Sequence, residues 1–470
     1  MESSVWNMNR AIQRRIIVQG NLILESPAHM GGDPGLVTDM PLSLDAVEQR
    51  ALLPGTSLAG ALRSYLRQRE LGYSTASEKT SLDQGLFGSI FDNEGDQSYL
   101  IVSNALSIGG KPAIELRDGV MLELDSRTAK DDMKFDFEVL QAGLVFPLRF
   151  ELLLPTNLKT QARLLQAFCI ALQGLERGEI ALGARKHRGF GKCQVSAWQV
   201  NDYDLTRPAG LIAWLNQDTR LAKNGDHIAG LLDVETSLDS RRSLQVEGTF
   251  KLAGPLLIRS NPADAKAPDS VHLATIHNGK RTPIISGTSI AGALRSQMTR
   301  IARTLELPDA DALVDGIFGK LGKDEQDETH ASRIWVEESK LSPGNTLVQN
   351  RVKIDRFTGG AYPTALFNQQ PLFAEKTDLK ISLRLENPTP AENGLLLLAV
   401  KDLWLSDLPL GGESSIGRGR LLGQELKIDL HTPESNTHWH ITGSATGELA
   451  ITGDAAELES FVTALNGGAR

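Results

Sequence analysis

A ten-residue segment that occurs twice is the feature of this 470-residue chain that most constrains its fold. Residues 54–63 read PGTSLAGALR and residues 286–295 read SGTSIAGALR, so eight of the ten positions are identical. Three shorter similarities follow in the same order, at nearly the same separation. They pair 86–88 with 317–319, 124–128 with 354–358, and 189–192 with 417–420. A repeat of this kind indicates two copies of one domain in tandem.

Each copy shows the patterns of an α+β domain. Alternating apolar and polar residues predict strands, and apolar residues at helical spacing after the repeated segment predict a helix. The expected strands and second helices cover 15–25, 99–103, 146–154 and 159–176, and in the other copy 244–258, 333–337, 379–385 and 392–405. The order strand–helix–strand–strand–helix–strand is ferredoxin-like. We therefore expect two ferredoxin-like, RRM-like domains.

The domain boundaries follow from changes in composition. We place the first domain at residues 1–200 and the second at 244–430. Residues 201–243 are polar with short helical pieces, which predicts a partly ordered linker. Residues 431–470 form a tail with two weak strand patterns, and its end is expected to fray.

Composition limits the classes of protein to consider. Lys and Arg number 49 and Asp and Glu 58, giving a net charge of −9, which disfavours a uniformly basic nucleic-acid or membrane-surface binder. Two cysteines without a CxxC motif argue against a disulfide framework and a cysteine zinc site. No secretory signal or membrane span is visible, so we expect a cytoplasmic protein without a membrane partner.

The repeated motifs carry a resemblance to a known family. The segment 52–63, LLPGTSLAGALR, resembles the PGSSLKGxLR signature of the RAMP superfamily. The Phe-Gly loops, the IDRFTG element at 354–359 and the two Gly-rich loops resemble the same family. More narrowly, the chain is similar to Cas-seven-type backbone subunits of type III CRISPR effector complexes. Two such units in one chain resemble the fused variants of type III-D.

The resemblance implies a fold detail, a function and partners. Each domain would carry a thumb-like β-hairpin insertion. The chain would bind CRISPR guide RNA beside other type III effector subunits, and it would cleave complementary target RNA at two kinks about six nucleotides apart, where bases are splayed out. Such an endoribonuclease would use a divalent metal, Mg²⁺ or Mn²⁺.

The resemblance also points to the catalytic residues. Asp39 lies fifteen residues before Pro54, where type III backbone subunits carry their catalytic aspartate, and Asp269 lies seventeen before Ser286. The two extra residues of the second copy fit an Asn-Gly hairpin turn near Gly279. A carboxylate there can act as a base on the RNA 2′-hydroxyl or hold the metal. The alternative is that both acids only end turns.

Other residues compete for the catalytic role. His29 and Asp33 belong to a Gly-rich segment suited to close approach to RNA, and a histidine can serve as an acid or base near neutral pH. The segment containing Asp33 is also a good turn. In the second copy, His272 is expected to be a packed or solvated strand residue rather than a catalyst.

The candidate RNA-binding residues lie in the Gly-rich loops, at the repeated helix and in the thumb-like segments. Glycine allows close approach to phosphates, which Arg and Lys neutralise and helix N-termini attract. The candidates are Ser57, Arg63, Arg127, Arg185, Lys186, Arg188, Lys192, Ser289, Arg295, Arg356, Arg418 and Arg420. The alternatives are a solvated loop, a solvated helix arginine and, for the hydroxyl residues at both helix starts, an N-cap.

Two rival functions remain open. The chain could be a non-catalytic scaffold that positions guide and target RNA for another subunit. It could also be a guide-processing RAMP endoribonuclease, which would depend on His29 and cut free precursor RNA. An acid in the same place in both copies favours target cleavage over the scaffold, because a scaffold does not need it.

Overall fold

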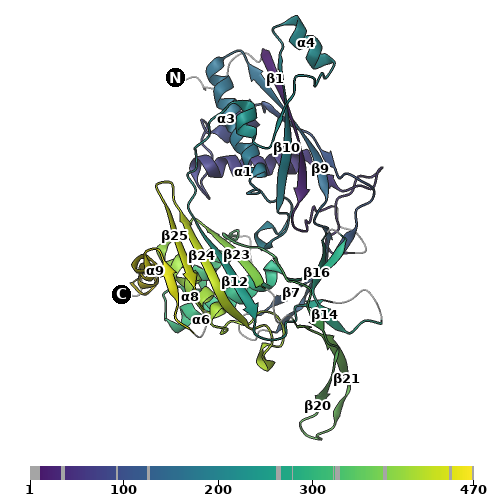
Figure 1. Ribbon diagram of the computed structural model, residues 1–470, viewed down its shortest axis with the longest axis vertical. Helices are drawn as coiled ribbons and strands as arrows, with labels where there is room; N and C mark the ends of the chain where they lie inside the picture. Colours follow the sequence, from purple (N-terminus) through teal and green to yellow (C-terminus); the bar gives the residue numbers. More distant parts are fainter. Residues whose placement is uncertain are drawn as a thin grey trace. The chain divides into compact units, whose positions relative to one another are not determined.

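The computed structural model describes residues 11–32, 38–91, 94–123, 128–260, 266–277, 279–320, 322, 329–373, 378–443 and 447–467. The chain forms two compact units (Figure 1). The first comprises Met1–Glu115, Phe137–Lys186 and Phe190–Arg241. The second comprises Leu116–Asp136, His187–Gly189 and Arg242–Arg470.

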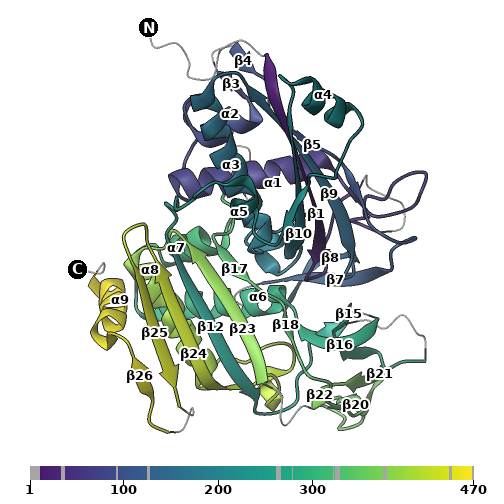
Figure 2. The ribbon, with the colours of Figure 1, turned by 45° about the horizontal axis from the view of Figure 1, so that its top comes forward.

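The first unit is a five-stranded sheet with its two long helices on one face, which Figure 2 shows. The strand order is β11-β10-β1-β9-β5, and all neighbouring strands are antiparallel. These strands are β1 (Ile12–Leu24), β5 (Leu100–Val102), β9 (Val145–Pro155), β10 (Cys193–Asp204) and β11 (Lys223–Gly225). Its long helices are α1 (Gly55–Leu71) and α3 (Leu158–Glu176).

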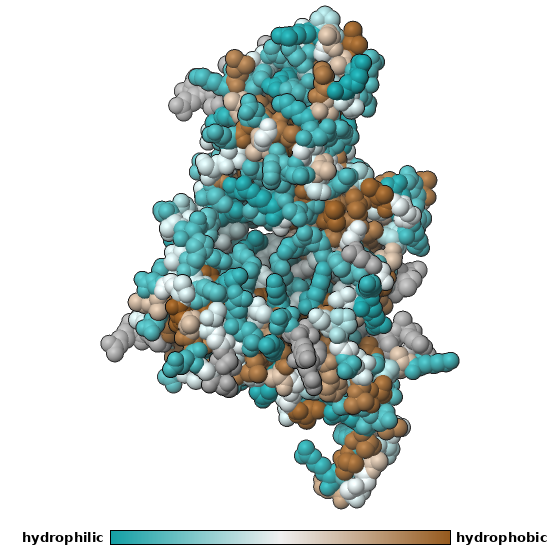
Figure 3. Space-filling view, viewed as in Figure 1, coloured by the Kyte–Doolittle hydropathy of each residue, from teal (hydrophilic) through white to brown (hydrophobic). Residues whose placement is uncertain are grey.

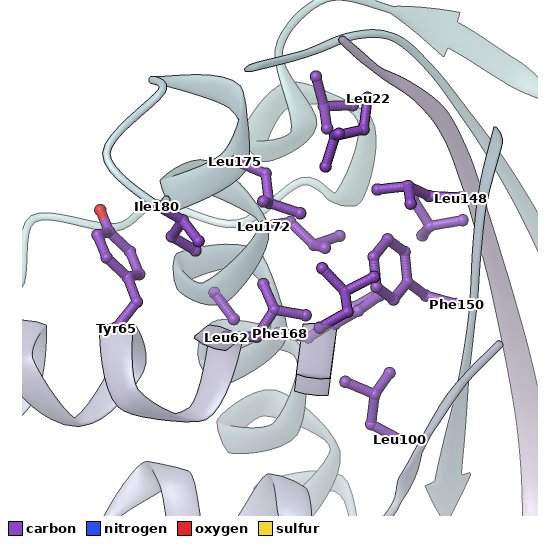
Figure 4. Close-up of a cluster of buried hydrophobic side chains, with 14 of the residues drawn as sticks. Leu22, Leu62, Tyr65, Leu100, Leu148, Phe150, Phe168, Leu172, Leu175 and Ile180 are labelled. Atoms are coloured by element: carbon purple, nitrogen blue, oxygen red, sulfur yellow. The ribbon is translucent and has the colours of Figure 1, made fainter. Parts of the chain in front are cut away.

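The hydrophobic core of the first unit lies between this sheet and these helices (Figure 4). Alternate residues of β9, among them Leu148 and Phe150, are almost completely buried against Phe168 and Leu172 of α3. Full burial of one such side chain contributes about 1.5–3 kcal/mol. The alternation predicted from the sequence is therefore the pattern that packs this sheet.

The second unit repeats the arrangement. Its sheet order is β17-β23-β12-β24-β25-β26, again antiparallel throughout. The strands are β12 (Ser243–Leu252), β17 (Ile334–Val336), β23 (Asp378–Glu386), β24 (Leu421–His431), β25 (Asn436–Thr442) and β26 (Ala450–Thr452). The helices α6 (Gly287–Thr304) and α8 (Pro390–Trp404) correspond to α1 and α3. The expected α+β class with two similar halves is confirmed.

The described residues of the segments predicted as a linker and a tail form helices and strands, whereas residues 468–470, where fraying was expected, lie outside the described residues. After β10 follow α4 (Pro208–Leu215), β11 (Lys223–Gly225) and α5 (Ile228–Leu232), and after β24 follow β25, β26 and α9 (Ala455–Gly467). In each unit the added strands extend the sheet, and the last helix packs on α3 or α8. The buried side chains of Ile228 and Phe461 anchor these helices. The polar composition of the two segments predicted less order because it does not show which few apolar side chains become buried.

Smaller elements connect the main ones. They are β2 (Leu52–Leu53), α2 (Leu82–Phe87), β3 (Ser89–Phe91), β4 (Glu94–Asp96), β6 (Ala105–Leu106), β15 (Ala274–His277), β16 (Lys280–Ile285), α7 (Ala310–Phe318), β18 (Ser339–Lys340), β19 (Asn345–Thr346) and β22 (Leu372–Phe373). Short 3₁₀ helices at Lys186–Arg188 and Ser414–Ile416 occupy the two Gly-rich loops. The hairpin of β15 and β16, where His277 pairs with Lys280, confirms the turn expected near Gly279.

Each repeat also contains a long inserted β-hairpin. In the first repeat it consists of β7 (Ile114–Leu122) and β8 (Ala129–Leu140). In the second it consists of β20 (Gln349–Ile354) and β21 (Ala361–Gln370), which join β13 (Arg259–Ser260) and β14 (Ser270–His272) in a four-stranded sheet. Exposed apolar side chains such as Phe357 and Leu366 lie along the second hairpin (Figure 3).

Candidate active sites in the two repeats

Backbone pairing holds the segment around Asp39 in the first repeat. The carbonyl of Met40 accepts the N–H of Glu138 at 3.0 Å, and Ser43 donates to the carbonyl of Met30 at 2.7 Å. Asp39 itself is exposed. The carboxylate therefore sits on a segment that two other parts of the chain fix, within reach of solvent.

A reciprocal pair of hydrogen bonds holds Asp269 in the second repeat. The backbone N–H of Asp269 donates to Oδ1 of Asn368 at 2.7 Å, and the backbone N–H of Asn368 donates to Oδ2 of Asp269 at 2.8 Å. Asp269 is also exposed, and it directly precedes β14. Its carboxylate thus has one oxygen engaged by β21.

The two aspartates occupy the same position in their repeats. Met40, which follows Asp39, makes a parallel bridge to Phe137, and Ser270, which follows Asp269, pairs in parallel with Gln369. The separations between corresponding residues are 270 − 40 = 230 and 369 − 137 = 232. The structure therefore aligns the two acids independently of their distance from the repeated helix.

His29 is packed inside the first unit. Its side chain is 2% exposed, Nδ1 lies 2.7 Å from the carbonyl oxygen of Glu138, and its ring meets the ring of Phe137 edge to face. Ala184 donates to the carbonyl of His29 as Gly412 donates to the carbonyl of Leu257. A buried leucine thus stands where the first repeat has His29, so the repeats do not share a histidine at this place.

Two of the predicted site residues lie outside the described residues. They are Asp33, a candidate for catalysis, and Arg127, a candidate for RNA binding. His272, by contrast, is 7% exposed, as expected for a packed strand residue.

The first Gly-rich loop reaches the segment of Asp39 through Arg185. The guanidinium of Arg185 lies over the ring of Phe137, 4.4 Å from its centre, and Nη2 is 3.7 Å from Sδ of Met40. Burial lowers the pKa of Arg185 from its usual value. The structure thus brings together a predicted cation and the predicted catalytic segment.

The other basic residues of this loop differ in accessibility. Arg188 donates to the carbonyls of Phe318 and Ile334 and to the hydroxyl of Ser332, and burial together with the charge of Arg295 lowers its pKa to about 10. Protein acceptors therefore already hold this guanidinium. Lys186 is half-buried. Lys192 is partly exposed, with Nζ 4.0 Å from a carboxylate oxygen of Glu25.

The second Gly-rich loop separates its two arginines. Arg418 is 2% exposed, and its Nη1 lies 2.6 Å from Oε2 of Glu413. Arg420 is exposed and donates to the carbonyl of Ser406 at 2.6 Å. Of this pair, only Arg420 presents its side chain to solvent.

The arginines of the repeated helices make the same ion pair in both repeats. Arg63 pairs with Asp83 of α2 at 3.3 Å, and Arg295 pairs with Asp315 of α7 at 2.5 Å. In both repeats 20 residues separate the partners. This repetition indicates a role in joining helices, which the prediction of RNA contact did not anticipate.

The predicted N-caps of these helices need correction. Pro54 is the N-cap of α1, and Ser286 is the N-cap of α6. The backbone N–H of Ser289 donates to Oγ of Ser286 at 3.3 Å. Ser57 is exposed in the first turn of α1, so its hydroxyl faces solvent instead of capping the helix. The cap lies earlier because the helix already begins at the glycine of the repeated motif.

Arg356 lies at the exposed tip of the β20–β21 hairpin. The turn is held by Asp355, whose Oδ1 accepts the backbone N–H groups of Phe357 at 2.7 Å and Thr358 at 3.3 Å. Lys353 lies over the ring of Tyr362 nearby. The tip therefore combines two cations with exposed aromatic rings.

The sequence patterns did not single out Arg259, Arg351 or Glu413, which the structure brings together in the second repeat. The signal was present in the duplication, because Glu413 aligns with Arg185 at the separation of 228 residues that the Gly-rich loops show. Both residues have positive φ, 58° for Arg185 and 62° for Glu413. The loop conformation is kept while the charge is reversed.

The comparisons with known proteins identify the class and then the family. Two α+β regions with matching loops and matching acids define a duplicated domain protein. A model of the RAMP superfamily matches residues 21–194 and 249–421, well over half of the chain, so the chain belongs to the RAMP superfamily. Membership implies a CRISPR-associated RNA-binding role, since RAMP proteins bind crRNA within Cas complexes. No curated protein matches the chain.

Two properties of the described residues concern membranes and metals. Among them, no helix is long and apolar enough to cross a membrane. Within the same residues, no group of three or more His, Cys, Asp or Glu side chains forms a metal cluster. As far as the described residues extend, neither candidate site therefore contains a preformed cage of three or more such ligands.

Proposed function

We propose that this chain is a backbone subunit of a type III CRISPR effector complex that binds guide RNA and cleaves complementary target RNA. The cuts fall at two sites, one at Asp39 and one at Asp269. The observation that carries the proposal is the shared position of these acids, each exposed and each directly before a residue in a parallel bridge to the inserted hairpin. The RAMP membership of both repeats supports the RNA-binding half of the proposal.

The proposed fold detail is a pair of ferredoxin-like RAMP domains with thumb-like hairpins. The strand orders β10-β1-β9-β5 and β24-β12-β23-β17, with two helices on one face, support this assignment. The hairpins β7–β8 and β20–β21 are the thumbs. Both emerge beside their aspartate, because β8 and β21 supply the pairing partners of Met40 and Ser270.

The chemistry needs little from the protein beyond position. A kinked RNA strand can place its 2′-hydroxyl in line with the adjacent phosphorus, and such alignment alone contributes several kcal/mol, of order 7–11 in the best cases. The hydroxyl proton leaves to a base, a P–O bond forms to the 2′-oxygen, and the bond from phosphorus to the 5′-oxygen of the next nucleotide breaks, after which that oxygen takes a proton from water. The products are a 2′,3′-cyclic phosphate and a 5′-hydroxyl. An exposed aspartate beside the kink is suited to take the proton.

A divalent metal, Mg²⁺ or Mn²⁺, fits an aspartate carboxylate of this kind when the RNA and water supply the other ligands. Mg²⁺ is commonly held by one or two carboxylates together with substrate phosphates and water. Asp39 would be the protein ligand in the first repeat and Asp269 in the second. In Asp269 the ligand atom would be Oδ1, because Oδ2 accepts the N–H of Asn368. When bound, the metal would stabilise the charge that develops on the phosphate.

The structure favours this proposal over processing by His29. His29 is buried, and its equivalent in the second repeat is Leu257. A mechanism centred on the histidine would therefore operate in one repeat only. The aspartates are shared and exposed, so they suit a reaction that occurs once in each repeat.

Replacement of both acids tests the proposal. The D39N/D269N variant, assembled with guide RNA and the other subunits, should retain guide binding and lose cleavage of complementary RNA. The matched control is Asp45→Asn, since Asp45 is an aspartate of the same segment whose Oδ1 instead caps the N–H groups of Val47 and Glu48. Cleavage by the double variant at the wild-type rate would contradict the proposal and favour the scaffold.

A further inference from the structure

Three arginines surround one carboxylate in the second repeat. Nη1 of Arg418 lies 2.6 Å from Oε2 of Glu413, Nη2 of Arg259 lies 3.5 Å from Oε1, and Nη1 of Arg351 lies 3.8 Å from Oε2. Three positive charges thus share one negative charge. The group, which we call the Glu413 cluster, carries an excess of two positive charges.

Two glutamines hold the buried part of the Glu413 cluster. Gln369 donates to Oε1 of Glu413 and accepts from Nη1 of Arg418 at 3.1 Å. Gln349 accepts from Nη2 of Arg418 and, at 3.4 Å, from Arg351. These contacts attach the centre of the cluster to β20, which carries Gln349, and to β21, which carries Gln369.

The outer arginines remain accessible. The side chain of Arg259 is 61% exposed and that of Arg351 is 33% exposed, whereas that of Arg418 is 2% exposed. Burial lowers the pKa of Arg418, and the charges of Arg351 and Arg259 lower it further against the opposing effect of Glu413. Arginine stays charged in proteins, so the cluster presents net positive charge to an anion.

The first repeat has different residues at the same positions. Gly31 bridges Leu42 as Arg259 pairs with His272, with separations of 228 and 230 residues between the copies. The loop positions follow the same offset, and Phe137 aligns with Gln369 through the parallel bridges. The corresponding pairs are Gly31 and Arg259, Phe137 and Gln369, Arg185 and Glu413, and Phe190 and Arg418. The first repeat thus has a glycine, two phenylalanines and an arginine at the positions where the second repeat has the connected polar side chains of the Glu413 cluster.

The Glu413 cluster lies on the four-stranded sheet next to Asp269. Arg259 is on β13, Gln369 on β21 and Arg351 on β20, all strands of the sheet whose β14 begins directly after Asp269. The forked guanidinium matches the oxygens of a phosphate, and it can contact two of them at once. We propose that Arg259 and Arg351 bind a phosphate of the RNA at this sheet, while Glu413 and Arg418 position them. This rests on the proposed function and adds a phosphate contact in the second repeat that Gly31, which stands in the place of Arg259, cannot make in the first.

RNA binding across a salt series tests the inference. The full chain is titrated into a labelled unstructured RNA, and R259A/R351A is compared with wild type. We expect roughly tenfold weaker binding and a salt slope smaller by about 0.7 for each phosphate that the variant no longer neutralises. The control R300A/R303A removes the same charge from exposed positions of α6. It should have little effect, and R259K/R351K should retain the slope because lysine still neutralises a phosphate.

The outcomes separate this inference from the proposed function. If wild type binds RNA and R259A/R351A binds with the same affinity and salt slope, the cluster is no phosphate site and the inference alone is wrong. If R259A/R351A binds RNA normally but no longer joins the other subunits, the cluster serves a protein carboxylate and the inference is again wrong. If wild type binds no RNA at any salt concentration, the proposed function and the inference both fail.

Discussion

Asp269 and Asn368 hold each other through two hydrogen bonds, one in each direction. The N–H of Asp269 donates to the amide oxygen of Asn368, and the N–H of Asn368 donates to the carboxylate of Asp269. The arrangement attaches the segment before β14 to the base of the β20–β21 hairpin. The proposed catalytic acid of the second repeat is therefore positioned by the element that we propose kinks the RNA.

The first prediction concerns this positioning. Asn368→Ala removes the acceptor for the Asp269 N–H, so the segment loosens and cleavage at the second site should fall about tenfold, with the first site unchanged. The measurement is the ratio of the two cleavage products. Asn350→Ala is the control, since Asn350 is the cross-strand neighbour of Asn368 and carries the same side chain. Equal loss at both sites would show that Asn368 acts on RNA binding in general.

The second prediction concerns the ion pairs of the repeated helices. Asp83 is completely buried and accepts from Ser77, Ser81 and Arg63, so Asp83→Ala should lower the free energy of unfolding by about 2–3 kcal/mol. The side chain of Asp315 is 30% exposed, so Asp315→Ala should cost about 1 kcal/mol or less. Urea unfolding of the full chain checks both values. If Arg63→Ala leaves stability unchanged but weakens RNA binding, Arg63 is an RNA ligand as predicted from the sequence.

The third prediction compares two glycines of one loop. Both Gly417 and Gly419 have positive φ, 86° and 75°. A Cβ on Gly419 would collide with the carbonyl of Leu410, whereas a Cβ on Gly417 meets nothing within 4 Å. Gly417→Ala should therefore cost only the strain of a left-handed residue, about 1–2 kcal/mol, and Gly419→Ala more than that. Thermal unfolding ranks the two, and equal melting temperatures would contradict the loop geometry.

The fourth prediction is a pH dependence of stability. Burial lowers the pKa of His272 from 6.5 to about 4, and its Nδ1 accepts the N–H of Ile258. Because the unfolded chain binds the proton more readily, the contribution to stability is present above pH 6.5 and is lost as the pH falls toward 4. The loss is about 3 kcal/mol at most. Urea midpoints between pH 4 and 7 measure it.

The duplication supplies the variant for this experiment. Leu42 stands in the first repeat where the second has His272, so His272→Leu should remove this part of the acid sensitivity. An unchanged pH profile in His272→Leu would show that other groups cause the acid sensitivity.

The duplication and the α+β class could be predicted because they depend on local patterns. Alternation in 15–25 and 244–258 reflects burial on one face of a sheet, and it became β1 and β12. The resemblance pointed to Asp39 and Asp269 at similar distances before the repeated motif, and their catalytic role stays a prediction. These features need no knowledge of which distant residues meet.

The fate of the basic residues could not be predicted in the same way. Arg418 and Arg420 are two residues apart in a Gly-rich loop, yet one is buried against Glu413 and the other is exposed. Arg188 is held by the carbonyls of Phe318 and Ile334, more than a hundred residues away. Whether a cation faces solvent depends on such distant partners, and composition cannot supply them.

Mapping the ends of cleaved target RNA tests the central claim most directly. The complex is assembled with guide RNA and either wild-type chain, D39N or D269N, and the positions of the new 5′-hydroxyl ends are sequenced. The account predicts two breaks with wild type, loss of one break with D39N, and loss of the other with D269N. Two breaks at unchanged positions and rates in both single variants would contradict it.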